Sequence, residues 1–363
     1  MRRDALHSAT ARPFRRFSGG LSLAATMVAP SAALAHGGEG LSAAEAWSAW
    51  NLTPEIGGPI LLILAVYIRG AARRRSVAEP VSAARHILFA GGMLALFLAL
   101  QSPVDAMGER LFLAHQIQHL LLRMVGPMLV VLARPQGLLV AGLPEALRRR
   151  LVAPVMASGA VSGLYRRLTG PLAAFLLFVL SLYVWQIPPV HNAALLDPAI
   201  HWAMHLTMLA AGFLFFAMIF DRRDLPSAPP HFLRIVLLFA AIVSNILLGA
   251  VTVFKTTVLY NAYDIEGRLF GIAPLADETA GGFVLWVPAS MMSIIAILIV
   301  VVDWNRTEGK RLRRGQDMAG PGRVAVPAGG AAASGRLGLL LGLGALTIFG
   351  LIIGTGIFVV SMG

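Results

Sequence analysis

Long apolar runs recur along the whole chain, and short segments between them carry most of the charge. Runs of about 18 or more apolar residues predict transmembrane helices, because roughly 20 residues cross the hydrocarbon core of a bilayer. We expect eight spans, at 54–70, 86–102, 111–133, 171–189, 199–220, 232–254, 281–302 and 337–361. The predicted fold is therefore all-α, a polytopic transmembrane helix bundle with a seven-span core and one C-terminal span.

The first 35 residues have the pattern of a secretory signal peptide. Five arginines precede a weakly apolar run from Leu21 to Leu34, and Ala33 and Ala35 are small residues of the kind found before a cleavage site. Cleavage after Ala35 would make His36 the first residue of the mature chain. The alternative is an uncleaved anchor, which has a similar charged and apolar pattern.

Charge predicts the orientation of the spans. The 363 residues are 57% apolar and 13% charged, with a net charge of +12. In a membrane protein an excess of positive charge first indicates which loops lie on the cytoplasmic side. We therefore expect a lipid bilayer and not a nucleic acid as the partner. With the mature N-terminus outside, 21 basic residues fall on the inner side and 3 on the outer side. This asymmetry predicts a multi-pass protein of the bacterial inner (plasma) membrane with a periplasmic N-terminus.

The predicted organisation has four parts: a signal peptide (1–35), the seven-span domain (36–305), a cytoplasmic linker rich in Gly, Pro and Ala (306–336) and the additional span (337–361). That last span contains Gly338-x-x-x-Gly342 and Gly350-x-x-x-Gly354. Small residues at this spacing let helices approach closely, which predicts a packing helix or a homo-oligomer contact.

Histidine is the main candidate for chemistry, because the chain has no cysteine and therefore no thiolate ligand. Two pairs have the same spacing, HQIQH at 115–119 and HWAMH at 201–205. Residues four apart share a helix face, so each pair can present two imidazoles to one centre. At 1.5 Å per residue both pairs lie about 3 to 12 Å into their spans, level with each other if the helices are neighbours.

Six histidines fall on the predicted outer side and are the candidate metal ligands: His36, His115, His119, His191, His201 and His205. Neutral imidazole suits copper, zinc, iron and haem, and Met107, Met204 and Met208 could add soft ligands for Cu(I). Polar packing or a proton relay is the alternative for the two pairs. For His36 the alternative is a favourable cleavage context.

Three further polar residues are expected to contact a cofactor, a ligand or a partner. Arg123 lies one turn beyond HQIQH on the same face, about 18 Å deep, and should pair with Asn245, backbone carbonyls or an acidic group of a partner; snorkelling is the alternative. Gln186 could orient an imidazole. Asp277 is the one acid of the loop before the seventh span that we expect to have a role.

The sequence makes no positive case for an enzyme. No nucleophile elbow, phosphate-binding loop, dinucleotide fingerprint or pair of catalytic carboxylates occurs where it could work. Gln116 occupies the place of the glutamate in a zincin motif.

Several segments resemble the CtaG cytochrome c oxidase assembly factors, between about residues 50 and 305. AHQIQHLLLRMVGPMLVVLARP (114–135) is similar to the family's H-M-x-x-H-L-L-L hallmark with its later prolines. Further similarity lies in YIRGAARRR (67–75), SPVD (102–105), HNAALLDPAIHWAMHLTMLAAGFLFF (191–216) and ADETAGGFVLWV (276–287).

The resemblance implies an inner-membrane factor that helps to mature a haem–copper oxidase, with copper as its cargo and an oxidase subunit as its partner. The family's histidines then correspond to the two H-x-x-x-H pairs, and its acidic residue to Asp277. The chain departs from the family at Gln186, where a histidine often follows the tryptophan, and at Glu278, where Gln is usual. His191, five residues after Gln186, is a candidate substitute.

Two other functions stay open at this point. Opposed histidines on two helices could ligate haem axially, as in a membrane electron carrier. A transporter of copper or another small solute would instead have its site at the bilayer midplane, near Arg123 and Asn245.

Overall fold

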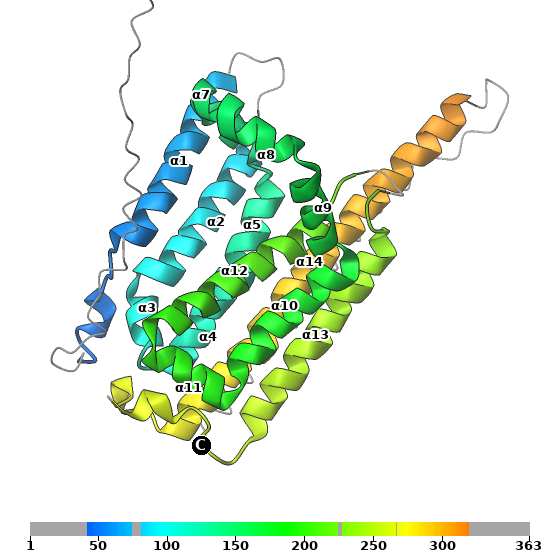
Figure 1. Ribbon diagram of the computed structural model, residues 1–363. Helices are drawn as coiled ribbons and strands as arrows, with labels where there is room; N and C mark the ends of the chain where they lie inside the picture. Colours follow the sequence, from blue (N-terminus) through cyan, green and yellow to red (C-terminus); the bar gives the residue numbers. More distant parts are fainter. Residues whose placement is uncertain (1–41, 75–80, 224–226, 266, 319–363) are drawn as a thin grey trace, which may run out of the picture. The chain divides into compact units, whose positions relative to one another are not determined.

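The computed structural model describes residues 42–74, 81–223, 227–265 and 267–318, and within these ranges every regular element is a helix (Figure 1). Six helices are long and apolar enough to cross a membrane, and a bent pair makes a seventh. The prediction of an all-α, multi-pass membrane protein is confirmed. The expected signal peptide, His36 and the additional span at 337–361 lie outside the described residues.

The seven spans follow the predicted order. They are α1 (Pro54–Arg74), α2 (Ala83–Gln101), the unit of α4 (Phe112–Leu120), η2 (Leu121–Val125) and α5 (Gly126–Ala133), α9 (Gly159–Leu168) with α10 (Pro171–Gln186), α12 (Pro198–Ile219), α13 (His231–Phe254) and α14 (Pro274–Met318). The chain bends by 66° between α9 and α10. The largest difference is in α14, which begins seven residues before the predicted 281, places Asp277 in its first turn, and extends beyond 302.

Short elements connect the spans at both ends of the bundle. The end of the bundle where α4 and α12 begin is here called the histidine end. The short elements at this end are α3 (Pro103–Gly108), α11 (Pro188–Leu196), η4 (Asn261–Asp264) and η5 (Leu269–Gly271). The opposite end is here called the basic end. The short elements there are α6 (Gln136–Gly142), α7 (Glu145–Leu147), η3 (Arg148–Val152) and α8 (Ala153–Ala157). η1 (Ala46–Ser48) precedes the first span.

Proline sets several helix starts. α3, α10, α11 and α12 each have Pro at a first helical position, where its missing N–H leaves no hydrogen bond unmade. The helices then pack by their apolar faces, with α13 against α14, α2 against α5, α4 against α14 and α10 against α12. The main core cluster includes Met124, Phe178, Phe215, Phe216 and Leu238.

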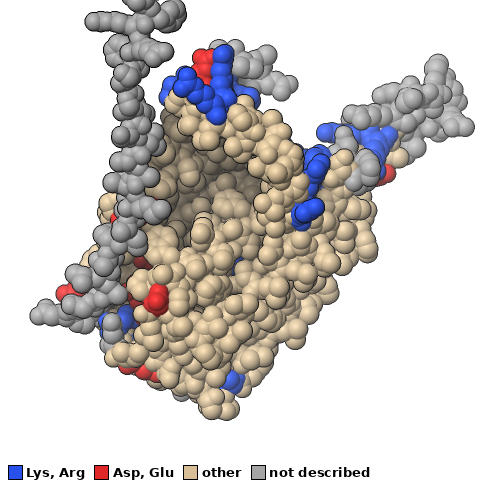
Figure 2. All heavy atoms as spheres, in the orientation of Figure 1, with Lys and Arg blue, Asp and Glu red and all other residues tan. Residues whose placement is uncertain are grey.

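The surface agrees with a membrane environment. In Figure 2 basic residues gather over α7 and α9, and the flanks of the helices between the two ends carry almost no charge. Large apolar side chains such as Leu61, Leu180, Leu206, Phe239 and Val251 point outward from these flanks. Exposed apolar flanks of this kind are stable in contact with lipid.

Candidate metal centre

The two H-x-x-x-H pairs lie together at the histidine end of the bundle. Ring centres are 4.3 Å apart for His115 and His119 on α4, and 4.4 Å apart for His201 and His205 on α12. Across the helices, His115 lies 5.3 Å from His201, and His119 lies 5.7 Å from His205. The pairs are level, and His115, His201 and His205 each offer a ring nitrogen within 4.8 Å of the other two.

Five buried ring nitrogens of these four histidines have no hydrogen-bond partner among the described residues. They are Nε2 of His115, His201 and His205, and both ring nitrogens of His119. A buried polar atom left unpaired costs about 1–3 kcal/mol, so five in one cluster point to a ligand that supplies the missing interactions. Neutral imidazole nitrogens converging from two helices fit a copper or zinc ion.

A close approach of α12 to the α4–η2–α5 unit brings the pairs together. Gly212 faces the carbonyl oxygen of Arg123, which would lie only 2.2 Å from a Cβ atom at this position. His205 lies about 10 Å before Gly212 along its helix, and His115 and His119 lie about 12 and 6 Å before Arg123 along theirs. Because both helices run in the same direction, this contact sets the four histidines at one level.

The carbonyl of Arg123 lies in a segment where the helix departs from regular α-helical geometry. Residues Leu121–Val125 form a π-helical turn, in which the N–H of Gly126 bonds the carbonyl of Leu121. Pro127 has no N–H for the carbonyl of Arg123, four residues earlier, so a regular α-helical bond is impossible there. π-turns of this kind are frequent at functional sites. Here the turn follows HQIQH directly.

Arg123 is buried and points into the bundle. Its Nη2 donates a 2.7 Å hydrogen bond to the carbonyl of Phe178 on α10, and its guanidinium lies 3.5 Å from the centre of the Phe178 ring. Of the partners expected for Arg123, the structure thus supplies a backbone carbonyl. Asn245 is also buried, but its side-chain nitrogen has no partner in the described part of the chain. A pocket beside Arg123 is lined by His119 and Gln116, and does not include Asn245.

Tyr263, in η4, links two histidines through its hydroxyl group. Its oxygen lies 2.8 Å from Nε2 of His191 and 2.7 Å from Nδ1 of His115. Nδ1 of His191 lies 2.9 Å from the carbonyl oxygen of Trp185, which can only accept, so this nitrogen carries the hydrogen. The neutral ring then accepts from Tyr263 at Nε2, and the tyrosine oxygen accepts from Nδ1–H of His115.

These hydrogen bonds determine the tautomer of His115. With its hydrogen on Nδ1, the lone pair of His115 is on Nε2, the buried nitrogen that has no hydrogen-bond partner among the described residues. Burial lowers the pKa of His191 to about 4 and raises the pKa of Tyr263 well above its ordinary value, so both stay neutral at physiological pH. Hydrogen bonds of this kind orient metal-binding imidazoles in many sites.

His191 lies beside the centre. Its ring centre lies 5.2 Å from that of His115, yet both of its nitrogens are hydrogen-bonded. The structure places His191 beside His115, with hydrogen bonds to Tyr263 and to the carbonyl of Trp185, and its role as a substitute ligand stays a prediction. Sequence reasoning missed Tyr263, because neither of the two tyrosines before α14, Tyr260 and Tyr263, has a spacing that connects it to a histidine.

Asp277 caps α4 from a different helix. Its carboxylate oxygens accept from the backbone N–H groups of Phe112 and Leu113, at 2.8 and 2.9 Å. Leu111, the residue before α4, has no side chain that could do this. A carboxylate at a helix N-terminus also stabilises the helix dipole. Asp277 thus holds the turn from which His115 projects, and does not itself contact a histidine in the described structure.

A buried charge network continues from Asp277. Arg268 bonds Asp277 at 2.5 Å and Glu278 at 3.2 Å, and all three side chains are at most 2% exposed. Glu278, which departs from the family pattern, also pairs with Lys255 at 2.5 Å and accepts from the N–H of Tyr260 at 2.9 Å. The extra carboxylate is therefore matched by a cation of this chain.

The other predicted donors have partners away from the ring nitrogens. Gln186 donates to the side-chain oxygen of Gln116 at 2.9 Å. Met204 and Met208 are fully buried in an apolar cluster with Leu182. Met107, the third thioether considered from sequence, packs in another apolar cluster with Leu111, so all three are core residues in this structure.

Taken together, these residues define a class of protein: a multi-pass membrane protein with a histidine cluster buried near one end of its helix bundle. Residues 65–307 match the family described as cytochrome c oxidase caa3 assembly factor (Caa3_CtaG), over more than half of the chain. The chain belongs to this family.

Curated relatives include uncharacterized proteins of two mycobacteria. Protein Mb0105 of Mycobacterium bovis is 30% identical over 277 residues, 71% of this chain and 40% of the relative. Protein ML1998 of Mycobacterium leprae is 25% identical over 272 residues, 72% of this chain and 40% of the relative. The chain thus spans less than half of the length of these relatives. No solved structure matches the chain.

Proposed function

We propose that the chain binds copper at the histidine cluster and delivers it to a subunit of a haem–copper cytochrome c oxidase during assembly in the bacterial inner membrane. The observation that carries the proposal is the convergence of unpaired imidazole nitrogens from His115, His201 and His205 within 4.8 Å, with His119 beside them. Membership of the caa3 assembly-factor family supports cytochrome c oxidase assembly as the process in which the copper is used. The role is binding and transfer, without catalysis.

Electrostatics favours Cu(I) over a divalent ion. The cluster consists of neutral imidazoles, and the metal-ligand group found among the described residues contains no carboxylate. Arg123 lies one turn further along the same helix and carries a positive charge that no carboxylate in the described residues offsets. Because a charge in the membrane interior is costly, an ion with one positive charge is easier to hold there than one with two.

Release requires access, and the four histidines differ in depth. His201 is partly exposed and lies in the first turn of α12, whereas His115, His119 and His205 are buried. We assign His201 as the ligand at which copper enters and leaves. The positive-inside rule predicts a periplasmic location for this end of the bundle, and His36 would be on the same side.

The test measures Cu(I) binding by the purified full chain under anaerobic conditions, by competition with a chromophoric Cu(I) chelator. Replacing His115, His119, His201 and His205 by Ala should remove binding. Replacing His86 and His231, which lie at the basic end, should leave it unchanged. Equal copper in the wild type and the four-histidine variant would refute the metal assignment.

A second measurement separates copper binding from the assembly role. In a strain that lacks the chain, we expect reduced oxidase activity and reduced copper in the oxidase, both restored by the wild-type gene. Normal oxidase in that strain would refute the assembly role. Full restoration by the four-histidine variant would refute copper delivery and leave an assembly role that does not depend on copper.

Haem is the alternative cofactor, and a visible spectrum tests it directly, because a haem protein has a Soret band. The packing favours a single ion. His115 contacts His119, His191, His201 and His205, with ring centres 4.3 to 6.0 Å apart, and a porphyrin would have to separate these rings.

A further inference from the structure

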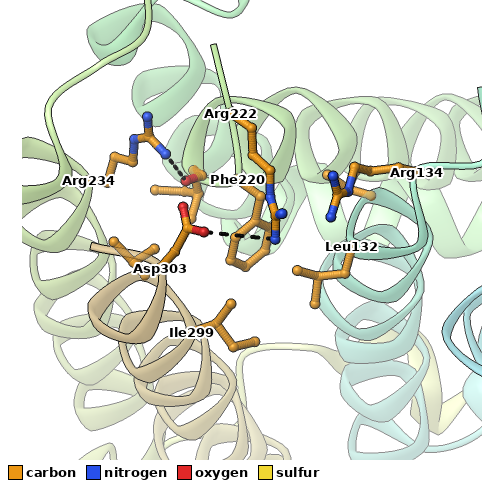
Figure 3. Close-up of a pocket in the computed structure, with 10 residues that line it drawn as sticks. Leu132, Arg134, Phe220, Arg222, Arg234, Ile299 and Asp303 are labelled. Carbon is orange, nitrogen blue, oxygen red and sulfur yellow. Dashed lines mark hydrogen bonds and ion pairs between the residues drawn. The ribbon is translucent and has the colours of Figure 1, made fainter. Parts of the chain in front are cut away.

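A second polar site lies at the basic end, in a pocket between the ends of α5 and α12 and the helices α13 and α14 (Figure 3). Its polar side consists of Arg134, Arg222, Arg234 and Asp303, and Leu132 and Phe220 are on its apolar side. The pocket is partly open to solvent. The histidine cluster and its supporting residues take no part in it.

Some of the positive charge here is already matched by helix ends. Nη1 of Arg234 donates to the carbonyls of Ile219 and Asp221 at 3.3 and 2.5 Å, at the end of α12. Nε of Arg85 donates to the carbonyl of Ala133 at 2.8 Å, at the end of α5. A helix C-terminus carries roughly half a negative charge, so these two guanidinium groups have a local counter-charge.

Arg134 and Arg222 are matched less well. Within the described residues, Arg222 lies 3.9 Å from Asp303, and the guanidinium of Arg134 forms no hydrogen bond or ion pair. Figure 3 shows the Arg222 guanidinium between Asp303 and Arg134. The nearby carboxylate of Asp221 is taken by Arg223, at 2.6 Å. Among the described residues that line the pocket, the single carboxylate of Asp303, which also lies 3.6 Å from His231, faces the guanidinium groups of Arg134 and Arg222, so one of these two positive charges has no carboxylate partner there.

The backbone holds Arg134 in this position despite strain. Its φ of 50° is in the left-handed region, which a residue with a side chain adopts at a cost. Its carbonyl is held by Nη2 of Arg85 at 2.6 Å. Partial burial, with the positive charges of Arg222 and Arg85, lowers the pKa of Arg134. The two guanidinium groups repel each other, and a bound anion would relieve this repulsion.

We propose that this pocket binds a singly charged phosphate group, and that the group is the phosphodiester of an anionic phospholipid. The charge of a phosphodiester equals the excess positive charge, and guanidinium groups bind phosphate oxygens in pairs of hydrogen bonds. The apolar side formed by Leu132 and Phe220 suits the start of an acyl chain. Basic pockets between transmembrane helices on the cytoplasmic side are suited to anionic headgroups. Inorganic phosphate has the same chemistry without the chain.

The experiment uses the purified full chain in a mild detergent, with native mass spectrometry to count bound lipid. The additives are phosphatidylglycerol, phosphatidylcholine or inorganic phosphate. We expect retention of phosphatidylglycerol over phosphatidylcholine, and a loss of about tenfold in affinity in the variant Arg134→Gln with Arg222→Gln. The control is Arg166→Gln with Arg167→Gln on α9, which removes two exposed charges outside the pocket.

A gain of binding provides a readout that misfolding cannot imitate. Asp303→Asn removes the carboxylate that competes with the anion, so phosphatidylglycerol should bind more tightly, by about fivefold or more. Retention of inorganic phosphate without lipid, lost in the double Arg variant, would assign the site to free phosphate. Equal lipid retention in the wild type, the double Arg variant and the α9 control would overturn the proposal, as would weaker binding in the Asp303 variant.

Discussion

The hydroxyl oxygen of Tyr263 lies 2.7 Å from Nδ1 of His115, whose other ring nitrogen, Nε2, has no hydrogen-bond partner among the described residues. Because the hydrogen of that hydroxyl goes to His191, the tyrosine oxygen can only accept from His115. The contact therefore places the His115 lone pair on Nε2. A residue 148 positions away in sequence thus determines which nitrogen of His115 carries the hydrogen.

Tyr263→Phe removes this acceptor and leaves the ring of residue 263 in its packing position. We expect Cu(I) affinity to fall by about 10- to 100-fold, the usual effect of losing a hydrogen bond to a ligand imidazole. The measurement is a chelator competition on purified protein. Tyr260→Phe is the matched control, because among the described residues the Tyr260 hydroxyl hydrogen-bonds only to Gln186. Equal losses in both variants would contradict the role of Tyr263.

His115 and His191 should respond differently to replacement by Gln. At position 115 the change removes a ligand, so binding should be lost and the number of nitrogen ligands, read by X-ray absorption, should fall. At position 191 the change removes only a support of Tyr263, so affinity should fall while the ligand number stays the same. A lower ligand number in His191→Gln would show that His191 binds the metal directly.

Gly212→Ala should separate the two histidine helices. A Cβ at this position would lie 2.2 Å from the carbonyl oxygen of Arg123, so α12 or the π-turn must shift. We expect a destabilisation of about 1–3 kcal/mol and weaker copper binding. Gly58→Ala on α1 is the control, because nothing lies within 4 Å of its added Cβ. There we expect no loss of thermal stability in detergent; an effect as large as that of Gly212→Ala would contradict the steric explanation.

Asp277→Asn tests the cap of α4 and the buried charge network together. Arg268 keeps Glu278 and Asp264 as partners, so the loss of this carboxylate should cost about 1–3 kcal/mol and lower copper affinity, because the start of α4 loses its cap. Asp264→Asn removes the more exposed partner of the same arginine, 39% accessible, and should cost about 1 kcal/mol or less. Thermal unfolding compares the two variants, and similar losses would argue against a special role of Asp277.

Glu278 and Lys255 should be energetically coupled, since they pair at 2.5 Å with exposures of 0% and 8%. Glu278→Gln alone leaves Lys255 unpaired and should be destabilising. Adding Lys255→Gln should recover part of the loss, with a coupling of about 1–3 kcal/mol in a double-mutant cycle. Additive losses would mean that the two residues contribute independently.

The sequence determined the class of this protein and the composition of its site. Apolar runs predict the spans, since a bilayer leaves only helices of about 20 residues or closed barrels as solutions. The i, i+4 spacing places His115 with His119 and His201 with His205, because that spacing is a property of the helix itself. Even the equal depth of the two pairs follows from their positions within the spans.

Only the tertiary structure decided which nitrogens are free. His191 and Tyr263 are 72 positions apart and meet because α11 and η4 pack at the same end of the bundle. Asp277 reaches the start of α4 because α14 begins earlier than its apolar run suggests. Such contacts depend on how helices pack across large sequence separations, and no local periodicity encodes them. The histidine pairs can therefore be predicted from spacing, but the orientation of their rings comes from residues that spacing does not identify.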